Sequence, residues 1–408
     1  MSEAGPSTPE VKTTGSAREV FCAFVKLGVS CFGGPIAHLG YFRDEFVMRR
    51  KWIAEDAYAD LVALAQFLPG PASSQVGFSL GLIRAGWRGG LMAFLGFTLP
   101  SALVMFGFAT GAGALAGRWG DGLLHGLRLV AVAIVAQAVM GMARTLCPDR
   151  ARATIGVIAC LIILASGSGL AQIGAIVLGG IAGLIFCRGE AQLVGSHMPI
   201  PISRHAGIIL LSVFILLLVG LPLARSLTAL PALSLFDAFY RSGALVFGGG
   251  HVVLPLLRQA VVVPGWVSDQ SFLDGYGAAQ AIPGPLFTFS AYLGAIVKGP
   301  PNGALGATIS LVGIFLPGLL AVSGTLPFWE SFRRRSEAQA VMRGVNAAVV
   351  GLLGAALYHP LWTTSVKTSG DLALALVAFV LLTKWKAPPI LVVIFSALGG
   401  IALAFVEA

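Results

Sequence analysis

The segment AQFLPGPASS (65–74) recurs as AQAIPGPLFT (279–288), and these two copies of Pro-Gly-Pro decide how the chain can fold. Proline has no backbone N–H, and its ring clashes with the carbonyl group one turn earlier, so an α-helix must end or kink at such a sequence. Both copies nevertheless lie inside apolar segments. The effect of each helix interruption therefore depends on whether water or lipid surrounds these apolar segments.

The composition indicates that these surroundings are a lipid bilayer. Of the 408 residues, 56% are hydrophobic and 11% are charged, whereas a soluble domain carries about 25% charged residues. Apolar runs at 153–186 and 206–224 reach or exceed the roughly 20 residues that a helix needs to cross a bilayer. The chain is predicted to be an all-α integral membrane protein.

Other classes of function find little support in the sequence. The chain has no nucleotide-binding fingerprint, so an enzyme or pump driven by a nucleotide is not expected. The five cysteines show no CxxC spacing, and neither a metal nor another cofactor is expected. The net charge of +9 is explained by cationic loop ends, as in other membrane proteins, without a nucleic-acid partner.

An internal repeat divides the chain into two similar halves. FVKLGVSCFGGPIAHLGYFR (24–43) aligns with FYRSGALVFGGGHVVLPLLR (239–258), and WIAEDAYADLVALAQFLPGP (52–71) aligns with WVSDQSFLDGYGAAQAIPGP (266–285). Further matches follow in the same order: GFTLPS with GIFLPG, HGLRLVAVAI with RGVNAAVVGL, and GGIA with GGIA. We expect a polar, disordered tail at 1–19, a first copy at 20–187 and a second copy at 235–408.

The segment 188–234 joins the two copies and predicts their relative orientation. It contains a charged linker and one extra apolar run, which is long enough for a single transmembrane helix. One unpaired helix turns the second copy upside down, so we expect inverted repeats with about 10–13 transmembrane segments. The cationic cluster at 43–51 then lies outside, against the positive-inside rule, so the first segment is re-entrant or the span count is off by one.

Inverted repeats with broken helices are typical of secondary transporters, which bind their substrate at the breaks. After each break the freed N–H groups at the start of the next helix would form an anion site. The alternative is a kink that only shapes packing. The predicted substrate-binding residues are Gln66, Pro69, Gly70, Pro71, Ser73 and Ser74 in the first copy, and Gln280, Pro283, Gly284, Pro285 and Thr288 in the second.

Glycine pairs and cations also recur in both copies. The pairs Gly33-Gly34 and Gly248-Gly249 would let a ligand approach the backbone, or would only pack helices closely. Cations inside a span mark substrate pathways, although terminal cations can instead reach the lipid headgroups. Lys26 and Arg241 are therefore predicted to bind substrate, and Arg43 and Arg258 to line the pathway; these four cations occupy equivalent positions in the repeat.

Two carboxylates and two histidines remain. Asp60 and Asp274 each lie nine residues before the first proline of a break, and they are predicted to couple transport to protons, with stabilisation of a helix N-terminus as the alternative. His38 and His251 are not equivalent in the repeat, so we expect structural roles for them. Trp52 and Trp266 are expected to anchor the chain at the membrane interface.

The stretch FGGPIAHLGYFR (32–43), together with QFLPGP (66–71), resembles the signature of the chromate ion transporter (CHR) family, in its long form with two domains. The second copy departs from the first in carrying Gly250 where the first has Pro35. The resemblance implies export of chromate across the inner membrane of a bacterium in exchange for protons. Sulfate has the same shape and charge, and a channel, a scaffold and a homodimer also stay open.

Overall fold

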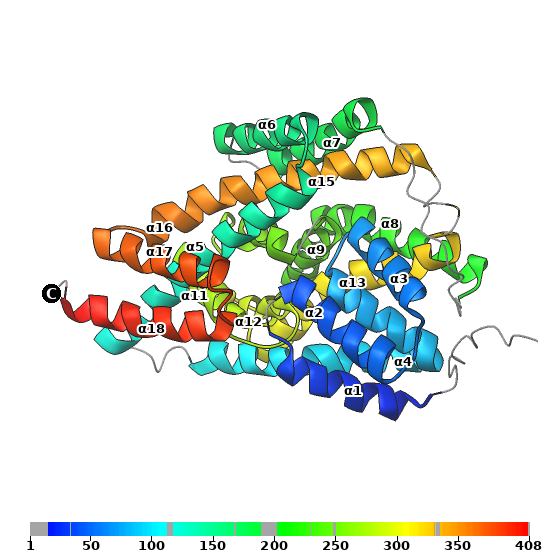
Figure 1. Ribbon diagram of the computed structural model, residues 1–408, viewed down its shortest axis with the longest axis horizontal. Coiled ribbons are helices and arrows are strands. Elements are labelled where there is room, and N and C mark those ends of the chain that lie inside the picture. Colours follow the sequence, from blue (N-terminus) through cyan, green and yellow to red (C-terminus); the bar gives the residue numbers. More distant parts are fainter. Residues whose placement is uncertain are drawn as a thin grey trace, which may run out of the picture.

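The computed structural model describes residues 15–32, 34–111, 117–166, 169–188, 202–228, 230–247, 250–329, 331 and 335–406, and the regular structure in these ranges is helical (Figure 1). Most of the expected tail lies outside these ranges, and the first helix begins at Ala17. Ser16 caps that helix, because its hydroxyl oxygen accepts the backbone N–H of Glu19 at 3.1 Å.

The helices follow the two copies of the repeat. In the first copy they are α1 (Ala17–Ser30), α2 (Gly34–Phe42), α3 (Glu55–Phe67), α4 (Ala72–Gly111), α5 (Arg118–Leu146), α6 (Arg150–Ser166) and α7 (Gly169–Phe186), with a π-helix at Arg43–Arg49. α8 (Arg204–Leu227) follows. In the second copy they are α9 (Pro231–Ala244), α10 (Val253–Leu257), α11 (Asp269–Gln280), α12 (Phe289–Ile296), α13 (Gly303–Thr325), α15 (Ser336–Ala356), α16 (Thr363–Ser365), α17 (Ser369–Thr383) and α18 (Pro389–Val406).

Shorter turns join the helices of the second copy. They are 3-10 turns at Gly250–Val252, Leu286–Thr288 and Leu326–Phe328, and π-helices at Arg258–Val262 and Leu357–Trp362. The π-helix at Arg258–Val262 occupies the place of the one at Arg43–Arg49, so the two copies share this irregular feature as well.

The chain is a multi-pass membrane protein. Within the described residues, 5 helices are long and apolar enough to cross a bilayer: Ala72–Gly111, Arg118–Leu146, Arg204–Leu227, Gly303–Phe328 and Ser336–Ser365. Many large apolar side chains are exposed on the outer surface, among them Leu103, Leu216 and Leu398, and a bilayer would cover them. The number of crossings, expected at about 10–13, stays a prediction.

A helical hairpin follows the first break. α4 leaves helical geometry at Ala85 and Gly86, where φ of the glycine is +63°. A Cβ on Gly81 would lie 2.4 Å from the carbonyl oxygen of Gly89, although eight residues of straight helix span about 12 Å. The chain therefore folds back on itself inside α4.

The second copy repeats this hairpin with α12 and α13. A Cβ on Gly294 in α12 would lie 2.2 Å from the carbonyl oxygen of Gly306 in α13. In both copies, glycine lets the two arms approach closely because no side chain separates their backbones. Each break is therefore followed by a tightly packed pair of helical arms.

The last helices of each copy pack on the other copy. Figure 1 shows α15 beside α6 and α7, and α5 beside α17 and α18. A Cβ on Gly126 in α5 would lie 2.1 Å from the carbonyl oxygen of Ser396, and one on Gly344 in α15 would lie 2.0 Å from that of Gly179. Gly126 and Gly344 are equivalent in the repeat. The contacts are thus reciprocal, and each copy completes the other.

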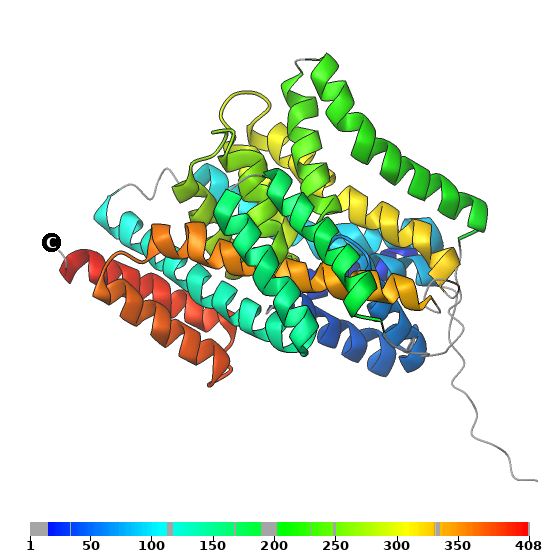
Figure 2. The ribbon, with the colours of Figure 1, turned by 90° about the horizontal axis from the view of Figure 1, so that it is seen from above.

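The unpaired helix α8 lies at the edge of the bundle (Figure 2). In its apolar window of 18 residues, 11% of the residues are buried. It touches the bundle through Gly207, where a Cβ would lie 2.9 Å from the carbonyl oxygen of Gly324. α8 therefore connects the two copies in sequence but lies at the periphery of the bundle.

Candidate functional site

Each Pro-Gly-Pro stands between two helical segments. α3 ends at Phe67 and α4 begins at Ala72; α11 ends at Gln280 and a 3-10 turn begins at Leu286. The central glycines have positive φ, +112° at Gly70 and +97° at Gly284, a region that residues with side chains rarely adopt. The two central glycines therefore share a positive φ, although an α-helix follows the first break and a 3-10 turn follows the second.

The central glycine of each break is bonded to the opposite copy. Gly70 donates its N–H to the carbonyl oxygen of Val246 at 2.7 Å, and Gly284 donates its N–H to that of Cys31 at 2.9 Å. Val246 and Cys31 are equivalent in the repeat, and each lies just before a phenylalanine and a glycine pair. Each break is thus tied to the glycine-rich segment of the other copy, and neither central N–H is free for a ligand.

Both central glycines also pack against an equivalent position on the hairpins. A Cβ on Gly70 would lie 2.8 Å from Cα of Gly318, and a Cβ on Gly284 would lie 2.1 Å from Oγ of Ser101. Ser101 donates its hydroxyl to the carbonyl oxygen of Pro283 at 2.6 Å. Contacts between the copies therefore hold both breaks in place in this conformation.

The first turn of α4 is polar and buried. The exposed fraction is 2% for Ser73, 3% for Ser74 and 0% for Gln75. The Gln75 amide nitrogen donates to the carbonyl oxygen of Pro69 at 2.6 Å, but among the described residues its Oε1 and the Ser74 Oγ have no hydrogen-bond partner. Buried polar atoms without partners are costly. These unpartnered atoms make this turn a candidate ligand-binding site.

His38 joins this turn to the second break. Its ring is 1% exposed, its Nδ1 lies 3.4 Å from the Ser73 hydroxyl, and it packs edge-on against Phe97 with ring centroids 5.3 Å apart. The ring also interacts with the Cys31 carbonyl, which accepts the Gly284 N–H. No hydrogen bond of normal geometry reaches Nε2 within the described residues. Sequence reasoning assigned His38 a structural role because the repeat lacks a second copy of it.

The turn after the second break is less polar. Val253 stands where the first copy has His38, and Phe287, Thr288 and Phe289 stand where it has Ser73, Ser74 and Gln75. All four are buried. The Thr288 hydroxyl donates to the carbonyl oxygen of Pro285 at 2.8 Å. The copies therefore share a framework but differ in chemistry, because aromatic residues replace Ser73 and Gln75. After the second break the buried Ser290 hydroxyl also has no hydrogen-bond partner among the described residues.

The two glutamines before the breaks also differ. Gln66 is exposed, whereas Gln280 is half-buried. The Gln280 amide nitrogen has no hydrogen-bond partner among the described residues. Gly34 opens α2 with φ +80°, while its predicted companions Gly33, Gly248 and Gly249 lie outside the described residues. A substrate-binding role for these residues stays a prediction.

The predicted cations lie in unlike surroundings. Lys26 is exposed on α1. Arg241 donates to Asp237 at 2.8 Å, and Arg225 reaches the same carboxylate at 3.4 Å. Asp237 is fully buried. The charge of Arg241 is therefore already balanced, and the repeat does not give Lys26 and Arg241 equivalent environments.

The cations predicted to line a pathway form the same ion pair in both copies. Arg43 lies 2.6 Å from Glu55, and Arg258 lies 2.8 Å from Asp269. Each pair ties a π-helix to the first turn of the next helix. A pair that recurs in both copies is consistent with a structural role. A role of Arg43 and Arg258 in the pathway stays a prediction.

The two predicted coupling carboxylates are both buried, with Asp60 2% and Asp274 6% exposed. Asp274 accepts a hydrogen bond from Arg128 Nε at 2.7 Å. Arg128 was not predicted from the sequence, although an arginine inside the apolar run LRLVAVAI itself indicates a functional position. One turn earlier on α5, His125 pairs with Asp371.

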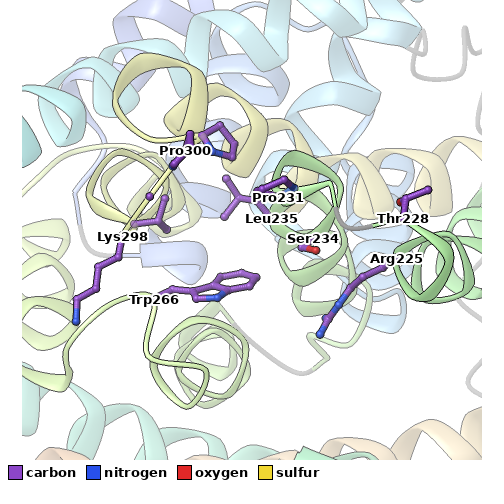
Figure 3. Close-up of a pocket in the computed structure, with 11 residues that line it drawn as sticks. Arg225, Thr228, Pro231, Ser234, Leu235, Trp266, Lys298 and Pro300 are labelled. Atoms are coloured by element: carbon purple, nitrogen blue, oxygen red, sulfur yellow. The ribbon is translucent and has the colours of Figure 1, made fainter.

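A surface pocket of about 330 Å³ lies outside the two breaks, and Trp266 is among the residues that line it. Figure 3 shows Trp266 between Lys298 and Arg225. Both cations are exposed, so the pocket is separate from the buried first turn of α4. Its lining residues are Arg225, Thr228, Pro231, Ser234, Leu235, Trp266, Val297, Lys298, Gly299, Pro300 and Pro301.

Comparison with known proteins gives one family. The family described as "Chromate transporter" matches residues 18–184 and 233–401. The chain is 28% identical to the "Chromate transport protein" of Pseudomonas aeruginosa over 97% of this chain and 94% of the relative. It is 27% identical to the "Probable chromate transport protein" of Synechococcus elongatus over 95% of each.

A shorter relative corresponds to part of the chain. The "Uncharacterized transporter YwrB" of Bacillus subtilis is 31% identical over 40% of this chain and 83% of its own length. Comparison with solved structures gives no match.

Proposed function

Because the chain belongs to the chromate transporter family, we propose that it is a secondary transporter that exports chromate across the cell inner membrane and so confers resistance to chromate. Support comes from relatives that are named chromate transport proteins and that align over nearly their whole length. No nucleotide-binding motif stands in the sequence, so the energy comes from the proton gradient or the membrane potential, with Asp60 and Asp274 as proton carriers.

The anion binds at the first turn of α4. The observation that carries this assignment is the buried, unpartnered Ser74 hydroxyl beside Ser73, Gln75 and His38. A helix N-terminus offers N–H groups and a partial positive charge to an anion. A tetrahedral dianion would also accept hydrogen bonds from the hydroxyl and imidazole donors. The second break positions this turn through the contact between Gly284 and Cys31.

Transport requires this site to open to each side of the membrane in turn. The first turn of α4 is buried in this conformation, so the segments that cover it must move apart before an anion can enter. The reciprocal contacts between the copies are the surfaces at which such motion would occur, as in transporters built from inverted repeats. This conformation is therefore an occluded one.

Inversion of the two copies predicts their topology. Ala54 and Ser268 are equivalent, exposed residues that precede α3 and α11. In a background without the exposed Cys22, Ala54→Cys and Ser268→Cys are expected to react with a membrane-impermeant thiol reagent from opposite sides of the membrane. Labelling of intact cells and of inverted vesicles measures this. Reaction of both positions from one side would contradict the inversion.

The function is tested by uptake of labelled chromate into inverted membrane vesicles. Uptake against a concentration gradient, lost when the proton gradient and the potential are collapsed, is expected. Uptake that only dissipates a chromate gradient would indicate a channel, and no flux would indicate a scaffold. Sulfate is the matched competitor because it has the same shape and charge. Stronger transport of sulfate than of chromate would reassign the substrate.

A further inference from the structure

The ion pair between Arg128 and Asp274 connects the two copies inside the bundle. Arg128 belongs to α5 of the first copy and Asp274 to α11 of the second. The two side chains are 12% and 9% exposed, with 2.7 Å between Nε and Oδ1. A Cβ on Gly277, three residues after Asp274, would lie 2.3 Å from the carbonyl oxygen of Leu127. The pair therefore lies at a close contact between two helices.

The repeat provides an internal comparison for this pair. Asn346 stands where the first copy has Arg128, and Asp60 stands where the second has Asp274. The fold thus accepts a neutral amide at the equivalent position of α15. A buried ion pair contributes little to stability, because removing two charges from water offsets their attraction. A cation in one copy alone is better explained by function than by folding.

Arg128 is better placed for a buried anion than the cations predicted from the repeat. Lys26 is exposed, and the Arg241 side chain is 37% exposed and bound to Asp237. Asp274 lies six residues before Gln280 at the end of α11, about 9 Å along the helix that leads to the second break. The planar guanidinium also offers two parallel N–H groups to an oxyanion.

Several ionisable groups surround Asp274. On α5, Asp121 and His125 are close enough to act on its charge, as is Tyr292 on α12. At the other end of α11, Arg258 is bound to Asp269. His125 is itself paired with Asp371. Arg128 donates a hydrogen bond to the Asp274 carboxylate.

We propose that Arg128 is a second binding position for the transported oxyanion, besides the first turn of α4, and that Asp274 occupies the guanidinium until Asp274 takes up a proton. In the empty protein, the carboxylate neutralises Arg128. When one proton from the aqueous phase converts Asp274 to a neutral carboxylic acid, Arg128 stays charged and accepts the dianion in place of the carboxylate. Proton and anion therefore bind together. Export of a dianion with one proton carries one net negative charge outward, so in this scheme the membrane potential, and not the proton gradient, supplies the energy. This inference rests on the proposed function, since it concerns how the same cargo is taken up.

The test measures chromate affinity of the purified full-length protein by titration calorimetry, at pH values above the second ionisation of chromic acid. The affinity of the wild type is expected to fall about tenfold for each unit of rising pH, because binding takes up one proton. Asp274→Asn is expected to bind with an affinity that does not change with pH and that is at least as high as the wild-type affinity at the lowest pH. Asp149→Asn, which alters an exposed pair with Arg152, should keep the slope of the wild type.

A double variant keeps the proposal falsifiable if a single charge left in the bundle harms folding. Arg128→Gln with Asp274→Asn removes both charges, and it should fold but bind chromate at least about tenfold more weakly than Asp274→Asn, as expected for loss of a charged partner. Equal affinity of these two variants would overturn the proposal. It would also be overturned if the chromate affinity of Asp274→Asn fell with pH as steeply as that of the wild type. A wild type that binds chromate without any pH dependence overturns this inference alone, whereas a wild type that binds none overturns the proposed function.

Discussion

Replacing Gly284 by alanine is expected to lower the free energy of unfolding by roughly 2–5 kcal/mol. The φ of +97° at this residue costs an L-residue about 1–2 kcal/mol. The new Cβ would also lie 2.1 Å from Oγ of Ser101, and overpacking of this kind costs about 1–3 kcal/mol. Thermal unfolding of the purified protein in detergent measures the loss. Transport should fall with it, because the second break can no longer hold Cys31.

The matched variants separate local strain from a general effect of alanine. Ser101→Gly removes the clashing oxygen and reproduces the glycine that the second copy carries at Gly318. Combined with Gly284→Ala, it should recover about 1–3 kcal/mol relative to the sum of the single changes. Gly107→Ala, on an open face of α4 where a Cβ meets no atom within 4 Å, should leave stability nearly unchanged. Strict additivity of Gly284→Ala and Ser101→Gly would contradict the packing described here.

The sequence predicts the helical membrane fold well because its evidence is local or repeated. Proline ends a helix whatever surrounds it, and α3 and α11 do end just before their prolines. The matches between the copies depend only on residue identity, and the family comparison covers the same two halves. The inverted orientation of the halves stays a prediction, since it depends on a bilayer that sequence symmetry does not define.

The chemistry of the site is less predictable, because the repeat assigns equal roles to equivalent positions. Ser73 and Phe287 are equivalent in the repeat, yet one belongs to a polar turn and the other is an aromatic residue in the core. Spacing also does not reveal which face of a helix points inward. On α1 the buried face carries Phe24 and Gly28, so Lys26 lies on the exposed side.

Contacts between residues of different copies cannot be predicted from a single sequence. Arg128 and Asp274 are 146 residues apart, and nothing in either local sequence names the other as its partner. The ties of Gly70 to Val246 and of Gly284 to Cys31 involve backbone atoms, which leave no trace in residue type beyond the glycine. Only the packing of the two copies brings these groups together.

Replacing Ser74 by alanine is expected to weaken chromate binding roughly tenfold to a hundredfold without lowering the stability of the empty protein. The Ser74 hydroxyl has no hydrogen-bond partner among the described residues, so its removal breaks no bond of the empty state and relieves a buried polar group. A hydrogen bond to a charged group contributes about 1.5–3 kcal/mol, which the bound state would lose. Calorimetric titration with chromate measures the change in affinity.

Chromate-dependent thermal stabilisation of Ser74→Ala and Thr288→Val tests the placement of the anion most directly, because a ligand that binds only the folded protein raises its melting temperature. The two residues are equivalent in the repeat, but the Thr288 hydroxyl is already bonded to Pro285. Thr288→Val should melt lower than the wild type and respond to the same chromate concentrations. Ser74→Ala should melt no lower and need at least about tenfold more chromate. Stabilisation of Ser74→Ala at wild-type concentrations, with a loss of response in Thr288→Val, would contradict an anion site at the start of α4.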